Sequence, residues 1–287
     1  MIAILKHELK SYFHSLTAYV FGAFLLAFIG IGALLYNIQA AVSNFEYVLG
    51  FGSAVFIVIV PILTMRVIAE ERKQKTDQLL YSLPLTTTQI IVGKYLALLI
   101  VFLIPLLVIA VYPLVFARFG DVHLLTSYGS LVAFFLVGAA LIALGIFISS
   151  ITDNQGFAAG IGIAVILFNY YSIQIVEHIT STALSSMLVL IVVWILAGLL
   201  IGHLTKNKNI AYGFSTLFSL GTILIYLNNS EMFEGLLPDI MRKLSLFDRL
   251  NTFVNGMFDL TAVVYFVTFI IFFLFLSVQS LEKRRYN

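Results

Sequence analysis

The side chains with the greatest capacity for polar chemistry lie in one short segment between two apolar runs. The segment begins Glu70-Glu71-Arg72 and continues to Asp77 and Gln78. Carboxylates, a guanidinium and an amide this close together can make charge-assisted hydrogen bonds. An ordinary charged loop of a membrane protein is the alternative that residue chemistry leaves open.

Other reactive constellations are missing from the sequence. There is no cysteine, so thiolate catalysis, disulfides and cysteine zinc sites are excluded. The five histidines are scattered without carboxylates at ligand spacing, so no metal site is expected. No Gly-x-x-x-x-Gly-Lys-Ser/Thr phosphate loop occurs, so the chain is not expected to bind ATP itself. We therefore expect a non-catalytic protein with no cofactor of its own.

The composition places this chain in a lipid bilayer. Of its 287 residues, 61% are hydrophobic and 10% are charged, whereas soluble domains carry about 25% charged residues. Mean hydropathy is +1.05. Basic and acidic residues nearly balance, at 16 and 14, so the net charge carries no information about nucleic acid. The expected surroundings are the lipid bilayer, with no nucleic-acid partner.

Long apolar runs predict about eight transmembrane helices, since a membrane-crossing helix needs about 20 mostly apolar residues. The runs are continuous rather than alternating, which favours helices over a β-barrel. The expected spans are residues 17–38, 48–69, 89–116, 127–150, 155–173, 185–204, 209–228 and 259–280. We predict an all-α integral membrane fold that forms a single domain over residues 1–287.

Lysine and arginine positions predict the orientation, because cytoplasmic loops carry an excess of both. With the N-terminus inside, twelve of the 16 basic residues fall on the inner side and four on the outer side. The inner residues are Lys6, Lys10, Arg66, Arg72, Lys73, Lys75, Lys94, Lys206, Lys208, Lys283, Arg284 and Arg285, and the outer ones are Arg118, Arg242, Lys243 and Arg249. We expect a multi-pass protein of the cell (inner or plasma) membrane with both termini in the cytoplasm.

Two amphipathic segments flank the spans. Residues 1–16 have apolar side chains at helical spacing, which predicts an elbow helix along the inner membrane surface; a polar lead-in to the first span is the alternative. Residues 229–258 form the longest outer segment, where charged and apolar side chains alternate. This second segment is expected to lie at the outer interface or to dip back into the membrane. Simple packing onto the other spans is the alternative to a gating or partner-binding role.

The polar segment itself reads as a short helix within a cytoplasmic loop, residues 70–86. Thr76 and Asp77 suit a helix start, and Pro84 ends the helix. Its apolar side consists of Leu79, Leu80 and Leu83. Thr86-x-x-Gln89 predicts a capping box that opens the third span.

Ionisable residues cluster at the ends of the predicted spans. Secondary transporters and proton pumps place such residues near the bilayer middle. Here they are Glu46, Arg66, Glu70, Lys94, Asp121, Glu177, His203 and Asp259. An ion-coupled secondary transporter, and a non-transporting scaffold or sensor, stay open as alternatives to the interpretation below.

Residues 69–97 resemble the signature region of ABC-2 type transporter permeases. The family pattern is Glu-Glu-Arg, then Gly-Thr, then Leu-Leu-x-Ser-x-Pro, then Gly-Lys early in the third span. It is matched by Glu70, Glu71, Arg72, Thr76, Leu79, Leu80, Ser82, Pro84, Gly93 and Lys94. Lys75 stands where the family usually has Gly.

The C-terminal sequence resembles the gliding-motility branch of these permeases, in which Phe-x-x-Gly-x-x-Asp precedes the last span. Phe253, Gly256 and Asp259 occupy those positions, and Asn255 stands where the branch often has Arg. The family core has six spans, so two additional spans are expected between about 174 and 228.

The resemblance implies a membrane-spanning permease subunit of an ATP-driven ABC transporter, and it favours export. ATP and Mg²⁺ would bind to a separate cytoplasmic ATP-binding subunit. A second permease subunit would complete a homo- or heterodimer, and the outer segment would suit an extracellular or membrane auxiliary subunit. The inner helix would dock on the ATPase through Glu70, Glu71, Arg72, Asp77 and Gln78. No substrate is assigned.

Two prolines lie within the predicted second and third spans. Pro61 and Pro105 each remove one helix hydrogen bond, so each is a candidate hinge. A static kink is the alternative at both positions.

Overall fold

The computed structural model describes residues 2–76, 85–178, 182–205 and 208–285. Every regular element in this part of the chain is helical, and the chain divides into two compact units. Unit 1 comprises Met1–Tyr170 and Leu246–Asn287, and unit 2 comprises Tyr171–Ser245. The predicted all-α fold is confirmed for the described residues.

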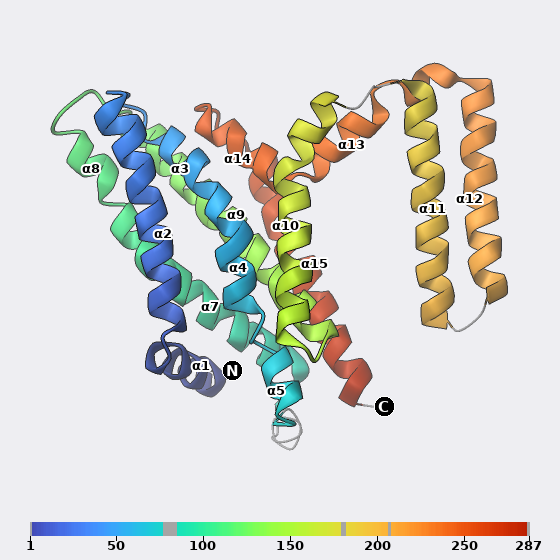
Figure 1. The fold of residues 1–287 in the computed structure, drawn as a ribbon, viewed down its shortest axis with the longest axis horizontal. Helices are drawn as coiled ribbons and strands as arrows, with labels where there is room; N and C mark the ends of the chain where they lie inside the picture. Colours follow the sequence, from blue (N-terminus) through green and yellow to red (C-terminus); the bar gives the residue numbers. More distant parts are fainter. Residues whose placement is uncertain (1, 77–84, 179–181, 206–207, 286–287) are drawn as a thin grey trace. The chain divides into compact units, whose positions relative to one another are not determined.

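Unit 1 contains most of the helices (Figure 1). In chain order they are α1 (Ile2–His14), α2 (Thr17–Ala33), η1 (Leu34–Gln39), α3 (Glu46–Gly52), η2 (Ser53–Val55), α4 (Phe56–Thr64), α5 (Ala69–Lys73), α7 (Thr87–Ile109), α8 (Tyr112–Phe116), α9 (Leu124–Ile151), the first part of α10 (Gln155–His178), α14 (Leu246–Val254) and α15 (Leu260–Arg285).

Helix α9 forms the centre of unit 1, where it contacts α3, α4, α7, α14 and α15. Residues 139–143 in its middle are at most 2% exposed. A helix that is apolar all round is buried on every side, and small residues let its neighbours approach closely. Phe102 of α7 adds an aromatic centre, since rings of α2, α4 and α9 lie 5.7–6.4 Å from its centroid.

Five segments of the described chain are long and apolar enough to cross a membrane. They are Thr17–Gln39, Glu46–Lys73, Thr87–Phe116, Leu124–Ile151 and Leu260–Arg284. Each agrees with a predicted span to within a few residues. The other three predicted spans coincide with helices α10, α11 and α12. All eight segments are therefore helical, and the number that cross the membrane stays a prediction for these three.

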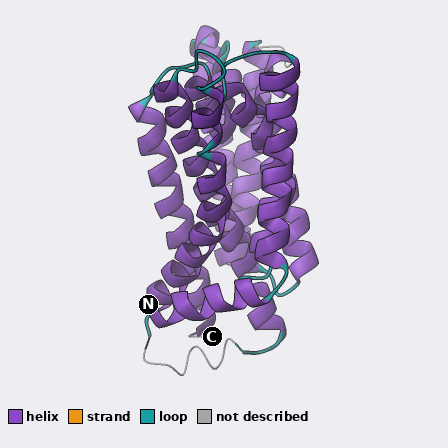
Figure 2. Ribbon diagram, turned by 90° about the vertical axis from the view of Figure 1, so that its left-hand side faces the viewer, coloured by secondary structure: helices purple, strands orange, loops and turns teal. Residues whose placement is uncertain are grey.

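The N-terminal segment forms the predicted helix. Helix α1 runs across the end of α2 (Figure 1, Figure 2), with Ile4 and Tyr12 buried and with Lys6 and Lys10 exposed. Its position at a membrane surface stays a prediction.

Unit 2 is a helical hairpin with a short cap. Helices α11 (Ala183–Thr205) and α12 (Lys208–Asn228) pack along each other, and η3 (Ser230–Phe233) and α13 (Leu236–Leu244) follow. The Trp194 ring lies 4.9 Å from that of Phe218, and Trp194 Nε1 donates to Thr222 Oγ1 at 3.2 Å. An aromatic stack with one internal hydrogen bond thus joins the two helices. The predicted outer segment is divided, since α13 belongs to unit 2 and α14 to unit 1.

The Phe-x-x-Gly-x-x-Asp stretch has a local structural reason at each position. Phe253 is buried, and its carbonyl accepts a hydrogen bond from Ser130 Oγ at 2.9 Å. Gly256 has φ +82°, a conformation that favours glycine. Asp259 Oδ1 accepts from the Thr261 amide at 2.8 Å at the start of α15. Hydrogen bonds from Thr261 hold the pKa of Asp259 below its ordinary value.

Candidate functional site

One end of unit 1 carries α1, α5, the start of α7 and the end of α15, and we call it the α5 end (Figure 1). The polar segment identified in the sequence begins here. Residues 65–68 form a turn between α4 and α5, so the second apolar segment is interrupted before its polar end.

A buried lysine joins three elements at the α5 end. Lys94 Nζ of α7 donates to Glu8 Oε1 of α1 and to Glu71 Oε1 of α5, both at 2.7 Å. It also donates to the Val67 carbonyl at 3.1 Å. The Lys94 side chain is 2% exposed. We call Glu8, Glu71 and Lys94 the α5-end triad.

The contacts of Lys94 explain how a charge is accommodated in this position. An ammonium has three N–H donors, and the three acceptors above use them all. A buried cation is costly unless it is paired and fully hydrogen-bonded. The triad meets both conditions, so α1, α5 and α7 depend on one another through a single side chain.

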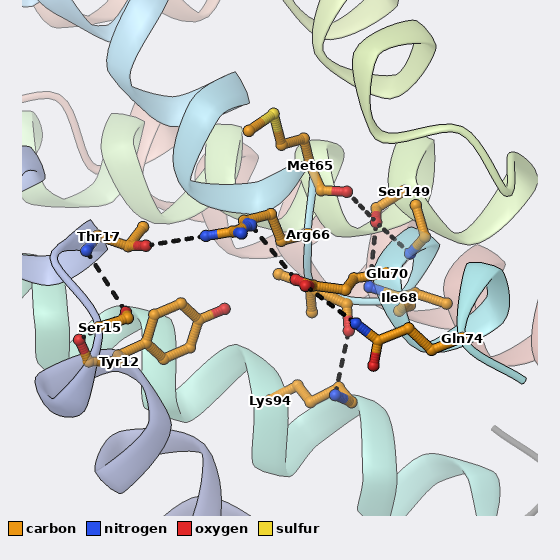
Figure 3. Close-up of polar contacts among 12 residues, drawn as sticks. Tyr12, Ser15, Thr17, Met65, Arg66, Ile68, Glu70, Gln74, Lys94 and Ser149 are labelled. Carbon is orange, nitrogen blue, oxygen red and sulfur yellow. Dashed lines mark hydrogen bonds and ion pairs between the residues drawn. The ribbon is translucent and has the colours of Figure 1, made fainter. Parts of the chain in front are cut away.

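The turn before α5 is held from α9. Ser149 Oγ accepts from the Ile68 and Ala69 amides, both at 3.1 Å, and it donates to the Met65 carbonyl at 3.1 Å (Figure 3). One hydroxyl therefore satisfies backbone groups on both sides of the interrupted helix. This contact fixes the position at which α5 leaves α4.

Helix α5 ends in a glycine-type turn that carries a lysine. The Thr76 amide donates to the Glu71 carbonyl at 2.9 Å and the Lys75 amide to the Arg72 carbonyl at 3.1 Å. These two bonds are those of a Schellman motif. Lys75 has φ +58°, the left-handed conformation that glycine adopts most readily. Lys75 therefore differs from the family pattern in residue type, but its backbone forms the turn that suits the glycine of that pattern.

A second set of ion pairs lies beside the triad. Arg284 Nη1 of α15 donates to Asp153 Oδ1 at 2.6 Å, and Arg72 Nη1 lies 3.8 Å from the same oxygen. Thr87 Oγ1 at the start of α7 donates to Glu282 Oε1 at 2.8 Å. The C-terminal part of α15 is thereby joined to α5, to α7 and to the turn after α9.

Arg66 and Glu70 lie on the more exposed side of the α5 end. Arg66 Nε is 3.3 Å from Glu70 Oε2, and Arg66 Nη1 donates to Thr17 Oγ1 at 3.3 Å (Figure 3). Gln74 Nε2 donates to Glu70 Oε1 at 3.3 Å. Burial, reinforced by the Glu8 and Glu71 carboxylates, raises the pKa of the nearby Tyr12 phenol, which stays neutral at physiological pH.

These residues border an open polar cleft of about 610 Å³ between α1, the start of α2, the α4–α5 turn and α7. Glu8, Glu70 and Glu71 line it together with Arg66 and Lys94. The arrangement can bind a polar segment of another molecule.

The structure places the predicted contact residues in different environments. Glu70 and Glu71 are partly exposed, with 33% and 25% of their side-chain areas accessible. The Arg72 side chain is 1% exposed and faces Asp153, so within this chain it lies inside the cluster. Asp77 and Gln78 lie outside the described residues.

Three exposed or paired positions were missed in the sequence. Lys73 and Gln74 are exposed on α5 and at its end. Glu8 was not predicted as a site residue. Ile4 and Tyr12 lie four residues before and after it, and these two apolar side chains indicate the helix face that turns inward. Sequence spacing carries no signal for a pair 86 residues apart, such as Glu8 and Lys94.

The start of α7 has the predicted cap. The Gln89 amide donates to Thr86 Oγ1 at 3.2 Å, and the Thr86 amide donates to Gln89 Oε1 at 3.4 Å. The capping box is confirmed. It fixes the helix that carries Lys94.

The two candidate hinges are buried within continuous helices. Pro61 lies inside α4, and a Cβ added to Gly162 of α10 would be 3.1 Å from its ring. Pro105 lies inside α7, and a Cβ added to Gly22 of α2 would be 3.9 Å from its ring. Both helices are interrupted about a turn later, at 65–68 and at 110–111. Hinge motion at the prolines stays a prediction.

Several apolar helices that can cross a bilayer, with α1 and α5 each ion-paired to Lys94 of α7 at one end, are the features of a multi-pass membrane protein. The sequence model described as ABC-2 family transporter protein matches residues 36–183, just over half of the chain. The chain therefore belongs to the ABC-2 family of transporter proteins. No curated protein matches it.

Family membership identifies the chain as a membrane component of an ABC transporter, a class that acts with an ATP-binding subunit and whose membrane domains are generally non-catalytic. The matched residues include Glu71 and Lys94. Glu8 lies outside the match, so the triad joins the family region to the N-terminal helix.

Proposed function

We propose that this chain is the permease subunit of an ATP-driven exporter whose ATPase is a separate cytoplasmic chain. The observation that carries the proposal is the α5-end triad within a family of transporter membrane components. The ATPase would dock on the loop 70–86, and ATP and Mg²⁺ would bind to that partner rather than to this chain.

The contacts of Lys94 supply a mechanical reason for this proposal. A force applied to α5 acts on Glu71, and through Lys94 it acts on α7 and on Glu8 of α1. Ser149 and Asp153 add connections from α5 to α9 and α15. Closure of the ATPase would therefore move the surface helix and the apolar helices together.

We propose eight spans with both termini in the cytoplasm. The excess of lysine and arginine on the α5 side supports this orientation. Helix α1 and the end of α15 lie at the same end of unit 1, as an even number of spans requires. On this proposal both units belong to one membrane domain, in which α11 and α12 are the two spans added to a six-span core.

We further propose that two permease subunits, identical or different, enclose the transport pathway. The outer segment, residues 229–258, is a candidate binding region for an extracellular or membrane auxiliary subunit. The Phe-x-x-Gly-x-x-Asp stretch supports a relationship to the gliding-motility branch, which describes ancestry and assigns no role in gliding.

The positions of the buried charges favour this proposal over ion-coupled transport. Among the described residues, the buried charged side chains are Glu46, Arg72 and Lys94. All three lie toward the ends of the apolar segments that contain them. An ion-coupled transporter needs such groups near the middle of the bilayer.

Copurification of an ATPase with the full-length chain tests the proposal. The loop variant is Lys73→Glu with Asp77→Arg, which leaves the triad intact. The matched control is Arg118→Glu, an exposed charge reversal far from the loop in the sequence. We expect an ATPase to copurify with the wild type and the control, and to be lost from the loop variant while membrane insertion is retained.

Two outcomes would contradict the proposal. If no ATPase copurifies with any of the three proteins, the transporter has no energy source and the scaffold interpretation replaces it. If the loop variant retains the ATPase at the wild-type level, docking does not use the 70–86 loop.

A further inference from the structure

A narrow apolar groove runs between α2 and α4 on the surface of unit 1. Its volume is about 250 Å³. Its outer walls are the exposed side chains Val20 and Phe24 of α2 and Val58 and Ile62 of α4. Both helices belong to segments that can cross a membrane, so the groove opens toward lipid.

Polar side chains line this groove at the α5 end, where Thr17 and Arg66 lie. Arg66 Nη1 donates to Thr17 Oγ1 and Arg66 Nε lies beside Glu70 Oε2, both at 3.3 Å. A guanidinium has five N–H donors, and these two contacts use two of them. The Arg66 side chain is 43% exposed, so its remaining donors are accessible.

Thr17 and Arg66 also line the polar cleft described above. The hydrogen-bonded pair therefore stands where an apolar groove meets a polar cleft (Figure 3). A molecule that occupies this junction must have an apolar chain on one side and a polar head on the other. Arginine forms bidentate hydrogen bonds with phosphate, and phosphate is the head-group anion of membrane phospholipids.

We propose that the α2–α4 groove holds one acyl chain of a membrane phospholipid and that Arg66 binds its phosphate. Burial of the chain in the groove supplies contact along its length, and Arg66 supplies the charge that fixes the head at the α5 end. A second copy of this chain would cover the apolar walls of the groove. It would leave unused the Arg66 N–H donors that can bind a phosphate. The proposal requires that α2 and α4 lie in the bilayer and does not rest on ATPase docking.

Photolabelling of the full-length protein tests this proposal. The protein is placed in nanodiscs of phosphatidylethanolamine and phosphatidylglycerol with a trace of phosphatidylethanolamine that carries a diazirine in its acyl chain. Labelled peptides are mapped by mass spectrometry without ATPase or ATP. The variants are Arg66→Gln, Arg66→Lys and Val58→Trp, which fills the groove, and the control is Ile271→Trp on the exposed face of α15.

We expect the label to concentrate on the groove walls of α2 and α4. Loss of a charged hydrogen bond to phosphate lowers affinity by about tenfold or more, so Arg66→Gln should lose most of the label. Arg66→Lys keeps the charge but not the bidentate geometry, so it should retain more label than Arg66→Gln and less than the wild type. Val58→Trp should lose it severalfold, and Ile271→Trp should match the wild type. A diazirine diacylglycerol, which has no phosphate, should label the groove weakly and equally in Arg66→Gln and wild type.

Several results would overturn the proposal. Equal labelling of the groove and the α15 face, or no response to both Arg66→Gln and Val58→Trp, would show surrounding bilayer lipid without a site. Disulfide-linked dimers of a Val58→Cys variant, in a sequence with no other cysteine, would identify a dimer interface instead. If the groove is unlabelled under these conditions and becomes labelled only when ATPase and ATP are added, the occupant is a transported amphiphile rather than a resident lipid. ATPase copurification is also measured with the Val58→Trp variant. Because it reports on the proposed function alone, it distinguishes failure of the lipid proposal from failure of the transporter proposal.

Discussion

Each end of unit 1 buries a charged side chain, and the two side chains differ in their hydrogen-bond partners. Lys94 at the α5 end and Glu46 at the opposite end are both 2% exposed. Lys94 has three acceptors, two of them carboxylates from distant parts of the chain. Glu46 Oε1 accepts one hydrogen bond, from Ser127 at 3.1 Å, and Glu46 Oε2 has no partner among the described residues.

This difference shows that burial alone does not identify a coupling residue. The partners of Lys94 belong to α1, to α5 and to the turn that precedes α5, so its removal would affect all three. Glu46 contacts a single hydroxyl of the central helix α9. On the proposed function, coupling belongs to the α5 end and Glu46 has a local packing role, and the following predictions test that contrast.

The largest effect is expected from Lys94→Met, which leaves two partly buried carboxylates side by side without their cation. Loss of one partner from a buried ion pair costs about 3–5 kcal/mol, so the melting temperature should fall strongly. Thermal unfolding in a fixed lipid and detergent mixture measures this. Lys10→Met on the exposed face of α1 removes the same charge and is the control. Equal stability of the two variants would contradict the role given to the triad.

A smaller loss is expected from Gly145→Ala in α9, behind the interrupted helix. An added Cβ would clash with the Thr64 side chain at the end of α4. Overpacking of this kind costs about 1–3 kcal/mol. Gly160→Ala in α10 is the matched control, because a Cβ there meets nothing within 4 Å. Thermal unfolding that ranks Gly160→Ala as the less stable variant would refute the close α4–α9 packing.

Glu46→Gln should change the free energy of unfolding by no more than about 1 kcal/mol, because the amide oxygen can still accept from Ser127. Ser127→Ala, which removes that donor, should cost more than Glu46→Gln. Chemical or thermal unfolding of both variants measures the difference. A loss for Glu46→Gln as large as that for Lys94→Met would abolish the contrast between the two ends.

The smallest effect, and a favourable one, is expected from Lys75→Gly. A residue other than glycine in the left-handed conformation destabilises the fold by roughly 1–2 kcal/mol. Glycine removes this strain, but it also raises the conformational entropy of the unfolded chain, which offsets part of the gain in stability. The net stabilisation should be about 1 kcal/mol or less. Lys75→Ala removes the charge but keeps the strained backbone, so it should give no gain. A gain of equal size in Lys75→Ala would attribute the effect to charge.

Much of the fold follows from local sequence patterns. Continuous apolar runs predicted every long helix, and Thr86-x-x-Gln89 predicted the start of α7, because both signals lie within a few residues. The site followed only in part. Glu71 was identified, but its pairing with Lys94 and Glu8 depends on how three helices pack.

Other features depend on tertiary contacts that spacing does not reveal. Arg72 reads as an exposed charge in the sequence, yet its side chain is buried beside Asp153. Lys75 departs from the family glycine, and only the backbone shows that the turn is retained. The outer segment reads as continuous, but its two helices belong to different units.

Amide hydrogen exchange of the full-length protein tests the central claim, that Lys94 joins α1, α5 and α7 into one unit. Local opening is measured in wild type, Lys94→Met and Glu46→Gln under the same conditions. We predict faster exchange in Lys94→Met at both residues 2–14 and residues 67–76, with Glu46→Gln unchanged at both. Faster exchange of α7 alone, with α1 and α5 as protected as in the wild type, would contradict the claim.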